Sequence, residues 1–287
     1  MILQDIKQAH GYLPSLNLKD GNTRFADFFV RAQQWLVSHI IGDSMEATLE
    51  AEVGLTAKDS HAALRDLCRR IIAEKALLDA IPEMDMQLTE AGFAVQNNEE
   101  FSPASSQRVD RLTNTMPLRI MMDCDTLVKY LIGNSDGTQV NPKPYDSWRS
   151  TEQYKYLTAC FMPTTAMFNR HLMPGVRSYE EYYDSLSTTA LQMKTVAAYY
   201  VSGEEVDRLV ELMRDNELLE VHREAIAWLC RVATSMWRGD ERAARNFAMY
   251  ARNIMLANLA AFPSFANSDA YNTPAVNLDG GKLVNFL

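Results

Sequence analysis

The chain of 287 residues is poor in glycine. Its 12 glycines make up roughly 4% of the residues, whereas soluble proteins average about 7%. Methionine, by contrast, occurs 15 times. Glycine destabilises helices and straight-chain apolar residues suit them, so this composition argues against a protein built mainly from β-strands. We therefore expect a mainly helical fold.

Long apolar runs are also missing. No stretch approaches the roughly 18 apolar residues that a membrane-spanning helix needs. The first residues, MILQDIKQAHGYL, lack the basic stretch, long apolar run and cleavage site of a signal peptide. The cysteines form no CxxC pair and are far apart: Cys68, Cys124, Cys160 and Cys230. We expect no membrane contact, and free thiols in a reducing compartment such as the cytoplasm.

The charge is moderate and acidic. The chain has 28 basic and 37 acidic side chains, for a net charge of −9, and 47% of its residues are hydrophobic. This much apolar content excludes general disorder, and the length is sufficient for one large or two small domains with a real core. The negative total argues against a strongly basic nucleic-acid-binding protein, so we expect no specific nucleic-acid partner.

The first half of the chain has a helical pattern. Apolar side chains recur every three to four residues over residues 23–41, and Gly42 is expected to stop this helix. A shorter amphipathic segment follows near Asp43–Glu52. The capping-box variant Thr56-x-x-Asp59 predicts the start of another helix, which should end before Pro82.

The hydrophobic period then changes. Met86 and Leu88 alternate with polar residues, and Phe93 and Val95 follow a turn that contains Gly92. This alternation predicts a small β-hairpin near residues 84–96. Because an isolated hairpin is only marginally stable in water, it must lie on the helices or on another subunit.

The remaining chain is again helical in pattern. A long helix after the loop at residues 97–103 contains Pro117, which should kink or restart it. The stretch Gly133–Trp148 is rich in Gly, Pro, Asn, Asp and Ser and is the best internal boundary. Further helical patterns lie at about residues 179–200, 204–214, 218–236 and, after Gly239, up to about residue 261.

These patterns predict a mainly α protein of two amphipathic helical units. We assign residues 1–100 to an N-terminal helical unit with the hairpin, 101–145 to a central helix and linker, 146–262 to a C-terminal helical unit and 263–287 to an extended tail. The two units share a plan, in which a helix ending at Gly42 or Gly203 precedes a helix with the string Leu-Cys-Arg. An internal duplication and a chance likeness of two helical stretches are both open.

Few residues are arranged in a way that suggests catalysis or metal binding. The histidines form no metal-binding spacing: they are His10, His39, His61, His171 and His222. The acidic pairs Glu180/Glu181 and Glu204/Glu205 open helices, where the helix dipole explains them. Asp123 and Asp125 flank Cys124 and are expected to face solvent or the edge of an interface. We therefore expect no catalytic residue, no metal and no cofactor.

One segment of the chain is distinctive. MDMQLTEAGFAV at Met84–Val95 is followed by Asn97-Asn98 and then by SPASSQRV at Ser102–Val109. It resembles a family of prophage-encoded proteins common in Bacteroidales, in which a hairpin ending GF-V-N leads into a helix that starts PAS–R. Most of the chain fits this family loosely. The resemblance implies a phage structural protein, at head completion or head–tail connection, and it implies no catalytic residues.

The resemblance and the composition together lead to a functional hypothesis. We expect a non-enzymatic virion assembly protein that forms homo-oligomers, such as a ring, and contacts a portal or tail protein. It would be cytoplasmic during assembly and then part of the virion. In the tail, Tyr271, Leu283 and Phe286 are the expected partner-binding side chains, although a floppy terminus fits the same composition.

Two rival functions are open. The first is a host helical adaptor that binds a protein partner outside any virion. The second is an enzyme of unknown class, which would need polar groups from Asp123, His171 or Glu181 to converge in a pocket.

Overall fold

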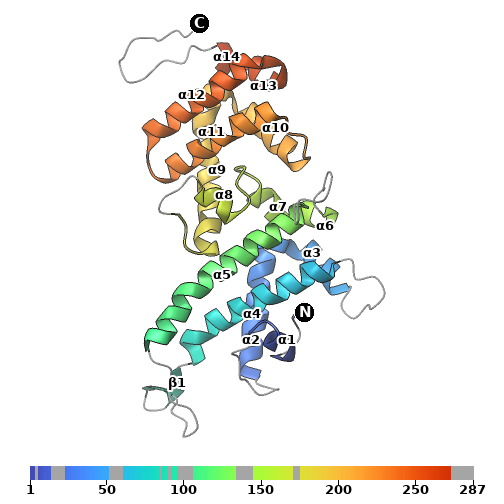
Figure 1. Cartoon of the computed structure of the whole chain (residues 1–287), viewed down its shortest axis with the longest axis vertical. Coiled ribbons are helices and arrows are strands. Elements are labelled where there is room, and N and C mark those ends of the chain that lie inside the picture. Colours follow the sequence, from blue (N-terminus) through green and yellow to red (C-terminus); the bar gives the residue numbers. More distant parts are fainter. Residues whose placement is uncertain are drawn as a thin grey trace. The chain divides into compact units, whose positions relative to one another are not determined.

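The structure is a computed structural model that describes residues 1–3, 6–13, 23–51, 61–84, 86–89, 92–95, 106–133, 145–170 and 175–272. The described chain is mainly helical (Figure 1). It divides into two compact units. The first contains Met1–Lys155, Thr164–Ala166 and Val176–Tyr183, and the second contains Tyr156–Pro163, Met167–Gly175 and Asp184–Leu287. These borders differ from the predicted ones, because the helix expected in a central segment at 101–145 belongs to the first unit.

The first unit is built around one long helix, α4. Its helices are α1 (Ile6–His10), α2 (Thr23–Leu36), the π-helical turn η1 (Val37–Ile41), α3 (Gly42–Ala51), α4 (Ala62–Met84), α5 (Ser106–Ile132), α6 (Asp146–Arg149) and most of α7 (Glu152–Leu157). Helix α4 packs on α2 and on α5. The apolar stripes predicted from the sequence are buried in this contact, as Phe25, Ile72 and Ile120 show.

The end of the first aromatic helix agrees with the prediction at Gly42. Helix α2 continues through η1 to Ile41, and Gly42 then adopts a φ of +69° and opens α3. A Cβ at this glycine would lie 2.6 Å from Thr151 Cγ2, so both the backbone angle and the space require glycine. The buried Trp148 indole donates a hydrogen bond of 2.7 Å to the Ile40 carbonyl and thereby satisfies an acceptor of the π turn.

One prediction about proline is wrong, and the restart expected at a second proline is absent. Helix α4 does not end before Pro82 but includes it and continues to Met84. A proline in the last turn removes only one hydrogen bond, which a packed helix tolerates. Helix α5 runs through Pro117 without a restart. The adjoining Met116 and Ile120 are buried, and this packing holds the two sides of the proline in one helix.

Two short strands follow α4. The backbone of β1 (Met86–Thr89) pairs antiparallel with β2 (Gly92–Val95), with Met86 opposite Val95 and Thr89 opposite Gly92. These residues lie in the segment whose alternating pattern predicts a hairpin. The capping signature Thr56-x-x-Asp59 lies outside the described residues.

The second unit is also helical. It contains parts of α7 and of α8 (Thr165–Asn169), most of α9 (Tyr179–Val201), and then α10 (Gly203–Arg214), α11 (Glu220–Trp237), α12 (Glu241–Ala257), the 3-10 turn η2 (Leu259–Ala261), α13 (Pro263–Ala266) and α14 (Asp269–Asn272). Helices α11 and α12 pack on each other, and α10 packs on α13. The helices predicted near residues 204–214 and 218–236 are confirmed.

The break between α9 and α10 does not fall on the predicted glycine. Ser202, not Gly203, has the positive φ, at +75°. A serine can take this otherwise unfavourable angle because its side chain accepts a hydrogen bond from the Glu205 N–H at 3.3 Å and so caps α10.

The start of the predicted extended tail is folded, which corrects the boundary at residue 263. Residues 263–272 form α13 and α14, and Phe265 and Ala270 are buried. Helix α13 packs on α10, so this stretch belongs to the second unit itself. Residues 273–287 lie outside the described part of the chain.

The four cysteines are free and buried, which confirms the prediction of free thiols. Burial raises the pKa of the Cys68 and Cys160 thiols to about 12. A thiol with such a pKa is almost wholly protonated at neutral pH, so these two cysteines are poor nucleophiles.

Candidate functional site

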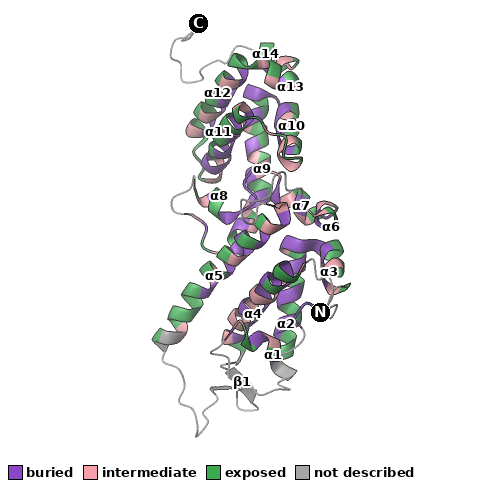
Figure 2. Cartoon of the chain, turned by 45° about the vertical axis from the view of Figure 1, so that its right-hand side comes forward, coloured by how far each residue is buried: buried purple, intermediate pink, exposed green. Residues whose placement is uncertain are grey.

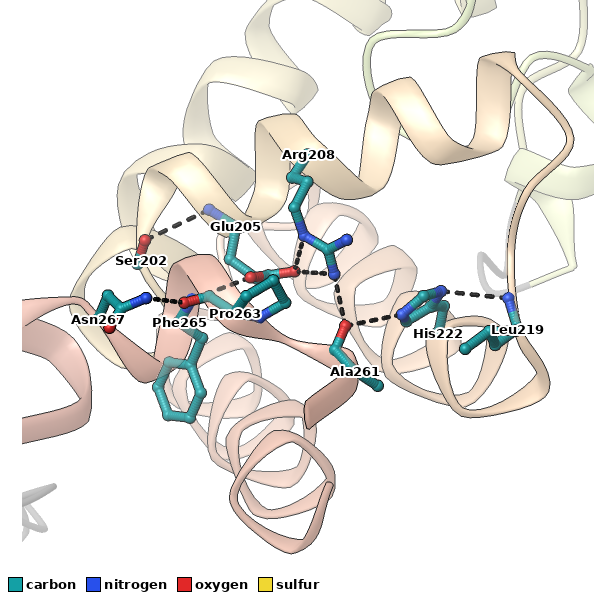
Figure 3. A network of polar contacts seen from close by, with 9 residues as sticks. All are labelled: Ser202, Glu205, Arg208, Leu219, His222, Ala261, Pro263, Phe265 and Asn267. Atoms are coloured by element: carbon teal, nitrogen blue, oxygen red, sulfur yellow. Dashed lines mark hydrogen bonds and ion pairs between the residues drawn. The ribbon is translucent and has the colours of Figure 1, made fainter. Parts of the chain in front are cut away.

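A network of polar contacts in the second unit is centred on Glu205 (Figure 3). This glutamate is completely buried. Its Oε1 accepts a hydrogen bond from Arg208 Nε at 2.8 Å and forms an ion pair with Arg208 Nη2 at 2.7 Å. Its Oε2 accepts from the backbone N–H of Phe265 at 2.9 Å. Both carboxylate oxygens therefore have donors, which offsets the cost of burying the charge.

The same network holds the carbonyl of Ala261. This oxygen accepts from Arg208 Nη2 at 2.6 Å and contacts His222 Nε2 at 2.9 Å. The other ring nitrogen of His222, Nδ1, accepts from the Leu219 N–H at 3.1 Å. Because Nδ1 accepts, Nε2 must carry the proton, and the ring is the neutral tautomer. His222 is therefore a buried histidine with both ring nitrogens bonded.

Arg252 extends this arrangement to α14. Its buried guanidinium donates to the Tyr200 carbonyl at 2.8 Å, to the Ala270 carbonyl, and to the Tyr271 carbonyl at 3.2 Å. Desolvation lowers the pKa of this arginine. The charged side chains of the network thus bind mainly backbone groups, so its evident effect is to position residues 261–271. Sequence reasoning missed Glu205, because it explained this residue only as an acid at the start of a helix.

Of the three predicted partner-binding residues, only Tyr271 lies among the described residues. Tyr271 is 36% exposed and packs edge-on against Phe265 of its own chain, with the ring centres 5.8 Å apart. Leu283 and Phe286 lie outside the described residues, as does His171. The docking of these side chains on a neighbour stays a prediction.

The prediction for Asp125 is wrong, because this side chain is buried rather than exposed. Its carboxylate accepts from the Thr165 N–H at 2.7 Å, the Thr165 hydroxyl at 2.9 Å and the Ala166 N–H at 2.8 Å. It therefore caps the start of α8. Burial raises the pKa of Asp125, and these three hydrogen bonds oppose that rise.

Asp123, the other aspartate of this pair, belongs to a cluster between α4 and α5. The side chain of Glu74 is only 1% exposed, and its Oε1 pairs with Arg119. Asp123 is half-buried and pairs with Arg70 at 3.4 Å. Burial is the main cause of the raised pKa of both carboxyls, and the nearby Asp123 carboxylate raises the pKa of Glu74 further. No described residue donates a hydrogen bond to Glu74 Oε2.

An aromatic cluster with an arginine occupies one face of the α11–α12 hairpin. The Trp228 ring lies 5.7 Å from Phe247 and 4.8 Å from Tyr250, and the Arg231 guanidinium lies 4.4 Å above the Trp228 ring. Tyr250 is 51% exposed, and Arg231 is also exposed. Figure 2 shows buried and exposed sides along both helices. We call Trp228, Arg231, Phe247 and Tyr250 the Trp228 surface.

The Trp228 surface is the second feature that sequence reasoning missed. A weak signal exists, because an aromatic and a partner recur three residues apart on each helix, as Trp228 and Arg231 and as Phe247 and Tyr250. Only the packing of α11 on α12 brings the two pairs together. Tryptophan, tyrosine and arginine are the residues that most often dominate protein–protein binding energy.

Within the described residues, no three or more His, Cys, Asp or Glu side chains are grouped as a metal ion would need. None of the helices in this part of the chain has the length and apolar character needed to cross a bilayer.

The chain was compared with known proteins. Residues 29–158 match the model of a family that is described as a family of unknown function (DUF6712). This match contains the distinctive segment at residues 84–109 and lies almost wholly in the first unit. Neither the curated proteins nor the solved structures gave a match.

Proposed function

We propose that this chain is a non-enzymatic structural protein of a phage or prophage. It works by binding copies of itself and other virion proteins, at head completion or at the head–tail junction. The Trp228 surface is the observation that carries the proposal, because an exposed tyrosine and two partly buried aromatic rings beside a stacked arginine are typical of a protein-binding surface. The resemblance of residues 84–109 to prophage-encoded proteins supplies the setting.

The buried polar groups support a structural role over a catalytic one. Glu205 and Asp125 use their oxygens on hydrogen bonds within the chain. Glu181, one of the residues considered for an enzyme, accepts from the Arg177 N–H at 2.8 Å at the start of α9. Groups that are engaged in this way position backbone, and they would have to break these bonds to act on a substrate.

We propose that the tail also takes part in assembly. Tyr271, at the end of the described residues, would dock with Leu283 and Phe286 on a neighbouring virion protein.

An internal duplication also stays a prediction. The order of long, short and long helix recurs as α2, α3, α4 and as α9, α10, α11. The packing differs, since α4 contacts α2 whereas α11 contacts chiefly α12.

A mass measurement tests this function. The full chain is purified alone and together with a portal protein encoded near it, and the masses of the species are measured by native mass spectrometry. We expect an oligomer of the chain, or a complex with the portal or particle. A chain that stays monomeric, joins no particle, and binds a host protein instead would contradict the proposal and favour the adaptor.

A further inference from the structure

Two regions of the second unit have opposite charge. Residues 220–257, which make up the α11–α12 hairpin, contain six basic and four acidic side chains and so have a net charge of +2. Residues 203–217, which contain α10 and the turn after it, have six acidic and two basic side chains and a net charge of −4. In a chain with a total of −9, the hairpin is therefore a locally basic region beside a concentrated acidic one.

The basic region includes the Trp228 surface. The Arg231 guanidinium lies over the rings of Trp228 and Phe247, at 4.4 and 5.8 Å from their centres. A guanidinium that stacks on a ring keeps N–H groups in its own plane, and these can bind a carboxylate. The surface thus offers rings for apolar contact and a positioned cation for an acidic partner.

The acidic region has the complementary properties. Its exposed acidic side chains form what we call the α10 acidic surface: Glu204, Asp207, Glu211, Asp215 and Glu217. Helix α10 is fixed from its other side, because Glu205 binds the Phe265 N–H and α10 packs on α13. Leu219, two residues beyond Glu217, is 57% exposed. The acidic surface therefore borders an apolar side chain that the rings of the Trp228 surface could cover.

We propose that the Trp228 surface of one copy binds the α10 acidic surface of the next copy. The two surfaces share no residue, and in both Figure 1 and Figure 2 helices α10 and α12 lie on different sides of α11. Such a contact is heterologous, so copies join head to tail, and it produces a ring when the rotation between copies closes. This inference rests on the proposed function, for which it names the partner and the surfaces.

The chain itself supplies the reason to choose a second copy as the occupant. A partner for the Trp228 surface needs several carboxylates on a rigid element next to an apolar side chain. The α10 acidic surface with Leu219 has these features and is present at the same concentration as the surface that it would bind. Opposite charges also favour the contact, and like charges disfavour pairing of two α10 surfaces.

A charge swap tests the contact. Arg231→Glu reverses the charge of the Trp228 surface, and a second variant, Glu204→Lys with Glu217→Lys, reverses part of the acidic surface. Asp207 and Glu211 stay unchanged because they form ion pairs with Lys194 and Arg214. As a matched control, Arg111→Glu makes the same change at an exposed position of α5 in the first unit. Sedimentation velocity measures self-association of each full chain, and circular dichroism checks its folding.

We expect each swap variant to self-associate at least about tenfold more weakly than the wild type, and the control to match the wild type. An equimolar mixture of the two variants should regain association, because each altered surface then meets its opposite charge. High salt should weaken the wild-type contact. If Arg231→Glu fails to fold, Arg231→Gln removes the charge without reversing it and is expected to weaken association in the same direction.

The outcomes separate this inference from the proposed function. Association that is unchanged in Arg231→Glu, or a mixture that does not regain association, overturns the head-to-tail contact. A wild-type monomer that still binds a portal protein also overturns it and leaves the proposed function standing. A wild-type monomer that joins neither portal nor particle contradicts both.

Discussion

Glu74 in the first unit and Glu205 in the second are both buried glutamates, yet their surroundings differ. Glu205 has donors on both oxygens, from Arg208 and from the Phe265 N–H. Glu74 pairs with Arg119 through one oxygen, while no described residue donates to the other, and its pKa is raised. A carboxylate therefore does not stabilise the fold merely because it is buried. It stabilises the fold when hydrogen-bond donors reach both of its oxygens.

Asp125 shows that this difference is not one between the two units. It lies in the first unit, as Glu74 does, and three donors from Thr165 and Ala166 reach its two oxygens. We therefore expect the effect of removing each carboxylate to follow its hydrogen bonds rather than its unit.

The largest effect is expected from Glu205→Ala. The substitution leaves the partly buried Arg208 without its carboxylate partner and the Phe265 N–H without an acceptor, so the free energy of unfolding should fall by about 3–5 kcal/mol. Urea unfolding followed by circular dichroism measures this. Its neighbour Glu204 is exposed, so Glu204→Ala should cost less than about 1 kcal/mol. Equal losses in the two variants would show that the network does not stabilise the second unit.

An intermediate effect is expected from Asp125→Ala. The variant removes the cap of α8, and we expect a loss of about 2 kcal/mol, measured in the same way. Asp110 lies exposed on the same helix, so Asp110→Ala is the matched control and should change stability by less than about 0.5 kcal/mol. A cost for Asp125→Ala no larger than that of its control would break the comparison.

The smallest effect is expected from Glu74→Gln, at about 1 kcal/mol or less at neutral pH, but it should change the pH dependence. Burial raises the pKa of Glu74 above its ordinary 4.5, so just above pH 4.5 the folded chain holds a proton that the unfolded chain has released. This contributes stability at the acidic end that is lost as the pH rises through the raised pKa. Glutamine has no such proton.

The measurement for Glu74→Gln compares the free energies of unfolding of wild type and variant at mildly acidic and at neutral pH. We expect the wild type to lose stability relative to the variant as the pH rises. A difference between the two proteins that stays constant with pH would show that Glu74 does not titrate in this range.

Much of the helical architecture could be predicted from the sequence, because the apolar period marks one face of each helix. The end of the helix at Gly42 was also predictable from local chemistry, because glycine tolerates a positive φ. Pro82 misled the prediction, because tertiary packing sustains a helix that local chemistry would interrupt. Ser202 also misled the prediction, because its side-chain hydrogen bond supports a positive φ that is usually found at glycine.

The polar network and the Trp228 surface could not be predicted in this way. Glu204 and Glu205 are adjacent and chemically identical, yet one is exposed and the other is buried. What distinguishes them is the Phe265 N–H, which comes from a distant part of the chain. Trp228 and Tyr250 likewise meet only because α11 and α12 pack on each other. Neither of these contacts can be inferred from the local spacing of hydrophobic residues.

The bond between Glu205 and Phe265 spans 60 residues and therefore sets an order of events during synthesis. Glu205 leaves the ribosome well before its second donor has been made, so its carboxylate must stay hydrated until the end of α12 and the turn beyond it have emerged. Helix α10 can take its final place only then, whereas α2, α4 and α5 are complete much earlier. The polar network of the second unit can therefore be completed only after the helices of the first unit have been made.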